Sequence, residues 1–112
     1  LRGNFRANAL DGGDGDDVLQ GRGGGDTYTG GLGDDTFRFQ NGFGTEIVTD
    51  FDEFSAAEVI DLSLVTAITD FADLQTNHLS QDGADSIITD GAGTIRLQNV
   101  LNADLDAADF GF

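Results

Sequence analysis

The sequence predicts an all-β domain with two parts: stacked strand–turn coils over residues 1–45, and a β-rich cap with a hairpin and a short helix over residues 46–112. Three observations support this prediction. Thirteen of the 17 glycines lie in residues 1–44. A nine-residue period runs through the same segment, and short runs of alternating apolar and polar residues, typical of strands, follow it. Since 112 residues are enough for one domain, we expect the two parts to form one structural unit.

The charge of the chain is strongly negative. It contains 21 acidic residues and five basic residues, all arginine, which gives a net charge of −16 at pH 7. A nucleic-acid-binding function is excluded because phosphate contacts require basic residues. The hydrophobic content of 38%, with nine phenylalanines, is too high for an acidic disordered tail. We therefore expect a folded domain whose negative charge is neutralised by a bound cation.

The residue types and segments that the sequence lacks exclude further classes. No apolar run approaches the ~20 residues of a transmembrane helix. Without cysteine there are neither disulfides nor thiolate metal sites. Methionine is also absent, and the opening residues contain no apolar signal-peptide segment, so we expect a fragment or a processed piece of a longer protein.

Four nine-residue segments align on their first glycine. They are GNFRANALD (3–11), GGDGDDVLQ (12–20), GRGGGDTYT (21–29) and GGLGDDTFR (30–38). The sixth position holds Asn8, Asp17, Asp26 and Asp35, and the eighth holds Leu10, Leu19, Tyr28 and Phe37. A flexible glycine-rich linker would not carry a large apolar residue at every eighth position. A fifth turn, 41–46, follows two residues out of phase and brings Glu46 to the sixth position.

Each repeat has the composition of a six-residue turn followed by a three-residue strand. Glycine allows the positive φ angles of the turn, and the strand directs its eighth-position side chain to one face. One repeat cannot bury that side chain alone, so the repeats must stack. Two repeats then make one coil of 18 residues, which places turn 3–8 next to turn 21–26 and turn 12–17 next to turn 30–35.

This stacking gives the acidic positions unequal neighbours. Turn 41–46 covers turn 21–26, so Asp26 is expected to have a neighbouring turn on both sides. Asp17 and Asp35 share the opposite edge and are expected to have one neighbouring turn each.

Stacked turns bring sixth-position carboxylates and backbone carbonyls together. Six to eight hard oxygen ligands, without sulfur or imidazole, are typical of Ca²⁺, whereas Mg²⁺ requires a more rigid octahedron. Without a cation the carboxylates would repel one another, so we expect binding to be coupled to folding. Two or three calcium ions are expected, one for each stacked pair of turns.

The repeats resemble the calcium-binding nonapeptide G-G-x-G-x-D-x-U-x of RTX (repeats-in-toxin) proteins. Segments 12–20 and 30–38 match this pattern in full, segment 21–29 departs from it at Arg22, and segment 3–11 is a weak copy. Pieces of the remainder are similar to the C-terminal part of secreted RTX proteins such as serralysin-type proteases and alginate epimerases. These pieces are TDF (49–51), VIDLS (59–63), GADSII (83–88) and the terminal DF-x-F (109–112).

The resemblance implies a right-handed parallel β-roll that binds calcium through sixth-position carboxylates and turn carbonyls. It also implies that the C-terminal region directs type I secretion. Carried over to this chain, the ligand carboxylates are Asp17, Asp26 and Asp35. The full set of candidate metal-site residues is Asn8, Gly12, Asp14, Gly15, Asp17, Gly21, Gly23, Gly24, Asp26, Gly30, Leu32, Gly33, Asp35, Glu46 and Asp50.

The cap is expected to contain two strands and a hairpin. Residues 46–51 (EIVTDF) and 59–64 (VIDLSL) alternate apolar and polar side chains, as short strands do. Strand-like runs over 86–89 and 94–100 flank a loop at 90–93 that contains two glycines, which indicates a hairpin.

A short amphipathic helix is expected between these strands. Asp70 is a suitable N-cap residue, and Phe71, Leu74 and Leu79 are expected to point inward from the helix. The only histidine of the chain, His78, falls in this segment, where a solvated or capping role is expected.

Catalysis is not expected. A single histidine cannot form a zincin pair, and no serine has a base in a recognisable arrangement. The spacing fits neither an EF-hand nor a phosphate-binding loop. The carboxylate pairs Asp16/Asp17 and Asp34/Asp35 recur in phase, whereas a glycosidase needs one pair. We interpret Asp16 and Asp34 as solvent-facing charges.

The expected function is that of a non-catalytic calcium-binding module. It would be exported by the type I secretion machinery of a Gram-negative bacterium, fold in extracellular calcium, and stabilise a larger secreted protein. The alternative is an adhesive module that binds extracellular polysaccharide through an exposed face of the coils or through the 83–100 hairpin.

Overall fold

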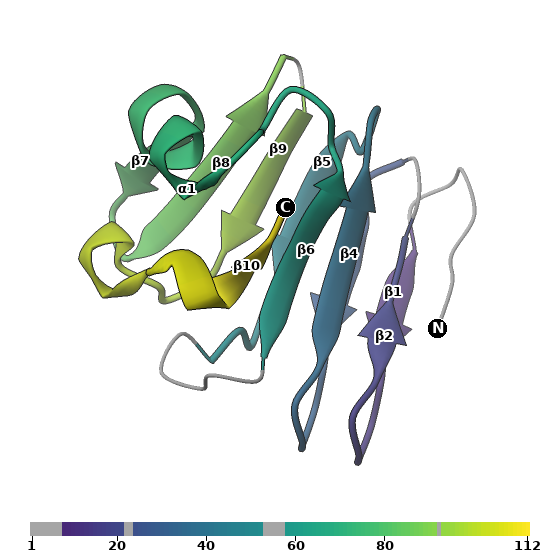
Figure 1. Ribbon diagram of the computed structural model, residues 1–112. Helices are drawn as coiled ribbons and strands as arrows, with labels where there is room; N and C mark the ends of the chain where they lie inside the picture. The colour runs from purple at the N-terminus through teal and green to yellow at the C-terminus, as the bar shows by residue number, and fades with distance from the viewer. Residues whose placement is uncertain (1–7, 22–23, 53–57, 92) are drawn as a thin grey trace.

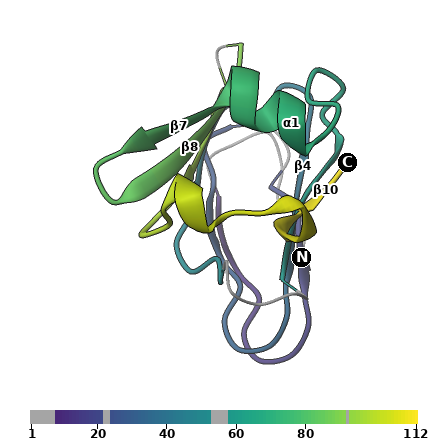
Figure 2. The same cartoon turned by 60° about the vertical axis from the view of Figure 1, so that its left-hand side comes forward.

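The computed structural model describes residues 8–21, 24–52, 58–91 and 93–112. Within these ranges the strands form two sheets that lie face to face (Figures 1 and 2). The six-stranded sheet has the order β1 (Ala9–Asp11), β3 (Thr27–Thr29), β5 (Thr45–Val48), β9 (Gly93–Leu97), β8 (Asp85–Asp90) and β7 (Leu79–Asp82). The four-stranded sheet has the order β10 (Phe110–Gly111), β6 (Val59–Leu64), β4 (Thr36–Gln40) and β2 (Val18–Leu19).

Consecutive strands of the N-terminal half alternate between the two sheets. Strands β1, β3 and β5 pair in parallel in one sheet, and β2, β4 and β6 do so in the other. Leu10 lies opposite Tyr28 and Leu19 opposite Phe37, which is the predicted spacing of 18 residues. Tyr28 lies opposite Val48, so the predicted two-residue shift of the fifth turn is confirmed as well.

The core lies between the two sheets and follows from the repeat. All four eighth-position side chains are buried, whereas Thr27 and Thr29 on either side of Tyr28 are half-buried. Tyr28, Phe37 and Phe39 pack edge to face with one another or with further phenylalanines, an arrangement that favours aromatic pairs. One inward side chain per repeat is enough because both sheets contribute to the same core.

The cap agrees with the prediction in its strands and hairpin and adds antiparallel pairing. Strand β6 has the predicted bounds, and β8 and β9 form the predicted antiparallel hairpin. Strand β9 also pairs in parallel with β5, so the six-stranded sheet is mixed. Strand β5 ends at Val48, earlier than predicted, and the Asp50 side chain beyond it accepts hydrogen bonds from the neighbouring turn at Gly30 and Gly31.

The helix is shorter than predicted. It consists of α1 (Phe71–Asp73) followed by a π-helical turn, η1 (Leu74–His78), and Leu74 is buried as expected. The prediction for Leu79 is wrong: it begins β7, where it lies opposite Ile88 of β8, so it packs from a strand. Strands β7 and β10 and the 3₁₀ turns η2 (Asn102–Asp104) and η3 (Ala107–Asp109) were not predicted.

We expect Asp70→Ala to lower the free energy of unfolding by about 1 kcal/mol. The Asp70 side chain caps α1 by accepting a hydrogen bond from the Asp73 N–H at 2.7 Å. Chemical denaturation measures the effect. Asp104→Ala is the control, because it removes the same charge from an exposed position, and its effect should stay within ~0.5 kcal/mol. Equal effects would show that the lost charge matters rather than the cap.

Candidate metal centre

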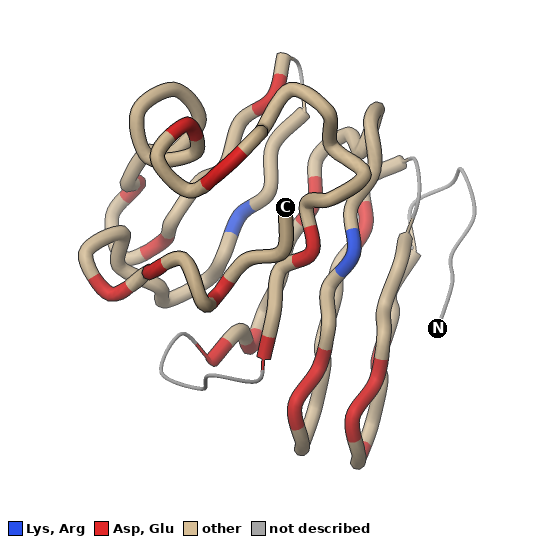
Figure 3. The backbone as a smooth tube through the Cα atoms, in the orientation of Figure 1, with Lys and Arg blue, Asp and Glu red and all other residues tan. Residues whose placement is uncertain are grey.

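The sixth-position side chains stack into two columns, one at each edge of the coils. The first column consists of Asn8, Asp26 and Glu46: Asn8 and Asp26 immediately precede β1 and β3, and Glu46 is the second residue of β5. The second column consists of Asp17, Asp35 and Glu58, which immediately precede β2, β4 and β6. Figure 3 shows acidic residues gathered at the turns of the N-terminal half.

Hydrogen bonds join the members of the first column. Asp26 Oδ1 accepts from the backbone N–H of Asn8 at 2.8 Å and from its amide at 3.1 Å. Glu46 Oε2 accepts from the Asp26 N–H at 3.2 Å. Each acidic side chain therefore uses one oxygen to hold the backbone of the turn below it.

The second column repeats this arrangement and extends it. Asp35 Oδ1 accepts from the Asp17 N–H at 2.9 Å. The Val59 N–H donates to the Asp35 carbonyl at 3.0 Å, as the Ile47 N–H does to the Asp26 carbonyl at 2.9 Å. Glu58 therefore lies next to Asp35 in register, but its Oε1 accepts from the Asp52 N–H at 3.2 Å and so holds a different segment from the one that Glu46 holds in the first column.

The sequence prediction missed Glu58 because no glycine repeat precedes it. One signal does mark it. An acidic residue followed by a strand whose second residue is apolar occurs in Glu58-Val-Ile-Asp, as it does in Glu46-Ile-Val-Thr. On the side of Asp35 away from Asp17, the pairing of β6 with β4 places Glu58 as a neighbour that the sequence analysis did not include.

Four carboxylate oxygens in the columns are buried without a hydrogen-bond partner. They are Oδ2 of Asp17, Asp26 and Asp35 and Oε1 of Glu46. The exposed fraction is 1% for Asp26 and 0% for Asp35 and Glu46. An unpaired buried carboxylate oxygen is costly, so these atoms require either a proton or a cation.

Glycines keep the space beside three of these oxygens open. A Cβ on Gly12 would collide with Asp17 Oδ2, and on Gly21 or Gly30 it would collide with Oδ2 of Asp26 or Asp35. A residue without a side chain is therefore needed at the first position of each turn, because this position lies against the aspartate at the sixth position of the same turn.

Backbone carbonyls of stacked turns lie close to the next turn. At Gly31 (φ +85°) and Gly33 (φ +100°), a Cβ would collide with the carbonyl oxygens of Gly13 and Gly15. Both φ angles are in the left-handed region, which glycine adopts without strain. A Cβ on Gly44 would likewise meet the Gly24 carbonyl. The atoms described here that could ligate a metal ion in the turns are thus all oxygens.

The remaining predicted residues lie around the columns. Asp14, Gly15, Leu32 and Gly33 are exposed at the turn tips, and Gly24 is half-buried. Asp50 is exposed, and its two oxygens accept from the N–H groups of Gly30 and Gly31, both at 2.9 Å. Gly23 lies outside the described residues.

In the described residues, acidic and histidine side chains alone do not form a complete metal-binding site. Within the part of the chain that the structure describes, no three histidine or acidic side chains gather as a metal-binding group. A cation in a column would therefore be held by neighbouring carboxylates together with backbone carbonyls. This oxygen-only donor set suits Ca²⁺.

Burial disfavours ionisation of the column acids. Burial raises the pKa of Glu46 to about 8, and the Asp26 carboxylate adds to the rise. Burial likewise raises the pKa of Glu58 to about 7 and raises the pKa of Asp35 above its ordinary value. Without a cation, the folded chain holds protons here that an unfolded chain would have released.

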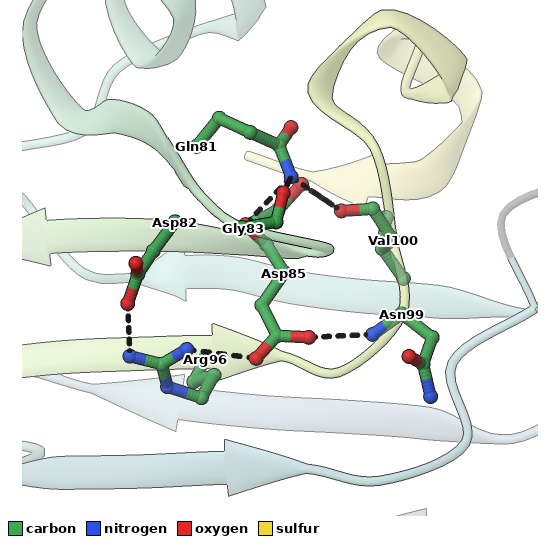
Figure 4. Close-up of polar contacts among 8 residues, drawn as sticks. Gln81, Asp82, Gly83, Asp85, Arg96, Asn99 and Val100 are labelled. Carbon is green, nitrogen blue, oxygen red and sulfur yellow. Dashed lines mark hydrogen bonds and ion pairs between the residues drawn. The ribbon is translucent and has the colours of Figure 1, made fainter.

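The arginines that the structure describes do not neutralise the columns. Arg38 pairs with Asp61 at 2.9 Å. Arg96 pairs with Asp82 and Asp85, each at 2.7 Å. Figure 4 shows that the Asp85 carboxylate also accepts from the Asn99 N–H, so this network fastens the cap hairpin.

Comparison with models of known protein families and with curated proteins finds no match. The helices in the described ranges are all too short to cross a membrane.

His78 belongs to the cap rather than to the columns. Its Nδ1 lies 2.7 Å from the Thr89 carbonyl and its Nε2 lies 3.4 Å from Asp73. His78 is the last residue of η1, and its half-buried ring links this turn to β8, so of the two expected roles, solvated or capping, full solvation does not apply. Asp16 and Asp34 are exposed, as predicted.

Proposed function

We propose that this chain is a calcium-binding β-roll module that folds as it binds Ca²⁺. The observation that carries the proposal is the set of four buried, unpartnered carboxylate oxygens, repeated at the sixth position in two columns. A carboxylate buried once by chance would not recur in phase with the repeat.

The residues that would hold calcium are pairs of neighbours within a column. In the first column these are Asn8 with Asp26 and Asp26 with Glu46. In the second they are Asp17 with Asp35 and Asp35 with Glu58. Bound calcium would supply the positive charge that the buried carboxylates lack.

The chain itself supplies the orientation of these oxygens. The hydrogen bonds from Asn8, Asp17 and Asp26 N–H groups fix one oxygen of the acid above and so direct the other. Because this register exists only in the stacked turns, folding and calcium binding are coupled.

Secretion is the setting that we propose for this coupling. The resemblance to RTX proteins supports export by type I secretion machinery of a Gram-negative bacterium. Extracellular calcium modules have dissociation constants of about 10⁻⁴–10⁻³ M, so such a module stays unfolded in the cytosol and folds outside. The proposed role is to stabilise a larger secreted protein, without catalysis by this module.

Calcium is expected to produce the fold in a titration followed by circular dichroism. In EDTA the chain should be mostly disordered, because its charge of −16 is uncompensated. Millimolar calcium should induce a β signal, and magnesium should do so much more weakly. Calorimetry counts the ions, of which we expect at least two. A spectrum that does not depend on calcium would refute the proposal.

The alternative, an adhesive module that binds polysaccharide, has no specific support in the described residues. Arg38 and Arg96, the arginines described, are both paired with aspartates and so offer no free cation to an anionic sugar chain. Binding of the calcium-loaded domain to a glycan array would favour this alternative.

A further inference from the structure

Asn41 and Gly42 lie in the turn between β4 and β5, and both are exposed. Among the six asparagines of the chain, Asn41 is the one that precedes a glycine. Glycine has no Cβ to shield its peptide nitrogen from the side chain before it. A Cβ added at Gly42 would meet nothing within 4 Å, so the space around this residue is open. Within the described residues, no hydrogen bond engages the Gly42 N–H.

The side-chain amide of Asn41 is tied to the loop that follows β6. Its Oδ1 accepts a hydrogen bond from the Thr66 N–H at 3.1 Å, and its Nδ2 donates to the Thr66 hydroxyl, also at 3.1 Å. The Asn41 N–H donates to the Leu64 carbonyl at 3.3 Å. The amide is therefore open to water, while two hydrogen bonds to one residue fix its orientation.

We propose that Asn41 is a site of intramolecular covalent modification, and that its contacts with Thr66 set the rate. The Gly42 peptide nitrogen loses its proton to solvent and forms a bond to the Asn41 Cγ. The bond from Cγ to Nδ2 breaks, and Nδ2 takes a proton from solvent and leaves as ammonia. Water then opens the resulting succinimide at either of its carbonyls, which yields aspartate or isoaspartate at this position.

The contacts with Thr66 oppose this reaction in the folded chain. Ring closure requires the Asn41 amide to turn toward the Gly42 nitrogen, and Nδ2 must leave. Both changes break hydrogen bonds that the amide makes with Thr66. Because β4 and β6 are neighbours in the sheet, these contacts exist in the folded chain and are lost on unfolding. The chemistry does not depend on whether the columns hold calcium.

The two products differ in how well they fit the turn. Each adds one negative charge to a chain whose net charge is already −16. An aspartate side chain can accept from both the Thr66 N–H and the Thr66 hydroxyl, so it suits the present arrangement. An isoaspartate adds one carbon to the backbone between β4 and β5. It therefore lengthens the turn that brings Glu46 into the first column.

Peptide mapping measures the modification at this position. A protease that cleaves before aspartate releases the peptide 35–49, in which Asn41 is the one asparagine. Aspartate at this position creates a new cleavage site, whereas isoaspartate does not. Mass spectrometry distinguishes both from the unmodified peptide.

In the folded chain, as checked by circular dichroism, Thr66→Val is expected to speed the modification of Asn41 about 5-fold, because one hydrogen bond is lost. Thr69→Val is the matched control. Thr69 is exposed in the same loop, but it contacts Asp73 through its backbone N–H, so this variant should react like the wild-type chain. In guanidinium, where the contacts with Thr66 are absent, all three chains should react at one faster rate.

Three results would each overturn part of the inference. Equal rates in the folded wild-type and Thr66→Val chains, or a slower rate in the variant, would refute the role of Thr66. Aspartate without isoaspartate would refute attack by Gly42, because direct hydrolysis of the side chain yields aspartate alone. Conversion of Asn77 or Asn99 in guanidinium as fast as that of Asn41 would refute the assignment of the site.

Discussion

Asp26→Asn and Asp35→Asn should each raise the calcium concentration at the folding midpoint by about 10-fold or more. Both aspartates stand in the middle of a column, Asp26 between Asn8 and Glu46 and Asp35 between Asp17 and Glu58, and both have a buried Oδ2 without a partner. Their loss therefore affects two ion positions at once. A calcium titration followed by circular dichroism measures the midpoint.

Two variants of equal charge control this experiment. Asp17→Asn should have a smaller effect, because Asp17 has a described neighbour on one side, Asp35. Asp104→Asn should have almost none, because Asp104 is exposed and belongs to η2 of the cap. Equal shifts in all four variants would mean that calcium responds to net charge alone and would contradict the assignment of the columns.

In EDTA, lowering the pH from about 8 to about 5 should induce folding. Glu46 has a pKa of about 8 when folded, against an ordinary value of 4.5, and Glu58 about 7. Between the ordinary pKa of each glutamate and its raised pKa in the folded state, the folded state binds more protons than the unfolded state. The stability of the folded state therefore falls as the pH rises from about 5 to about 8. Each unit of raised pKa corresponds to roughly 1.4 kcal/mol. Circular dichroism across this pH range tests the sign.

Saturating calcium should reverse this dependence. Carboxylates that bind calcium must be ionised, so their pKa values fall below those of the unfolded chain. Their stabilising effect is then present at neutral pH and is lost as the pH falls through about 5 toward 3, with more calcium moving the loss to lower pH. Glu46→Gln should flatten the EDTA profile above pH ~7. Identical profiles with and without calcium would rule out these carboxylates as ligands.

The coils could be predicted from the sequence because their period constrains several features at once. Spacing sets which glycines stack, the eighth position sets the buried face, and the two-residue shift before Glu46 sets the register of β5 on β3. Asp17, Asp26 and Asp35 were therefore placed correctly relative to one another.

The cap was harder to predict because its structure depends on distant partners. Leu79 fits an amphipathic helix locally, but pairing with Ile88 places it in a strand. Glu58 carries no glycine signal, and its role in the second column follows from the pairing of β6 with β4.

The way the cap joins the coils makes the domain modular. In the sheets of the described residues, the part of the cap that follows β6 pairs with the earlier strands at two places, β9 with β5 and β10 with β6, which are the last strands of the two parallel stacks. The long connections from β5 to β9 and from β6 to β10 add little loop-closure entropy. Closing a 50-residue loop costs only about 0.9 kcal/mol more free energy than closing an 18-residue loop. Coils could thus be added or removed on the N-terminal side, each with the cation that the proposed function assigns to it, while every strand pairing of the cap is preserved.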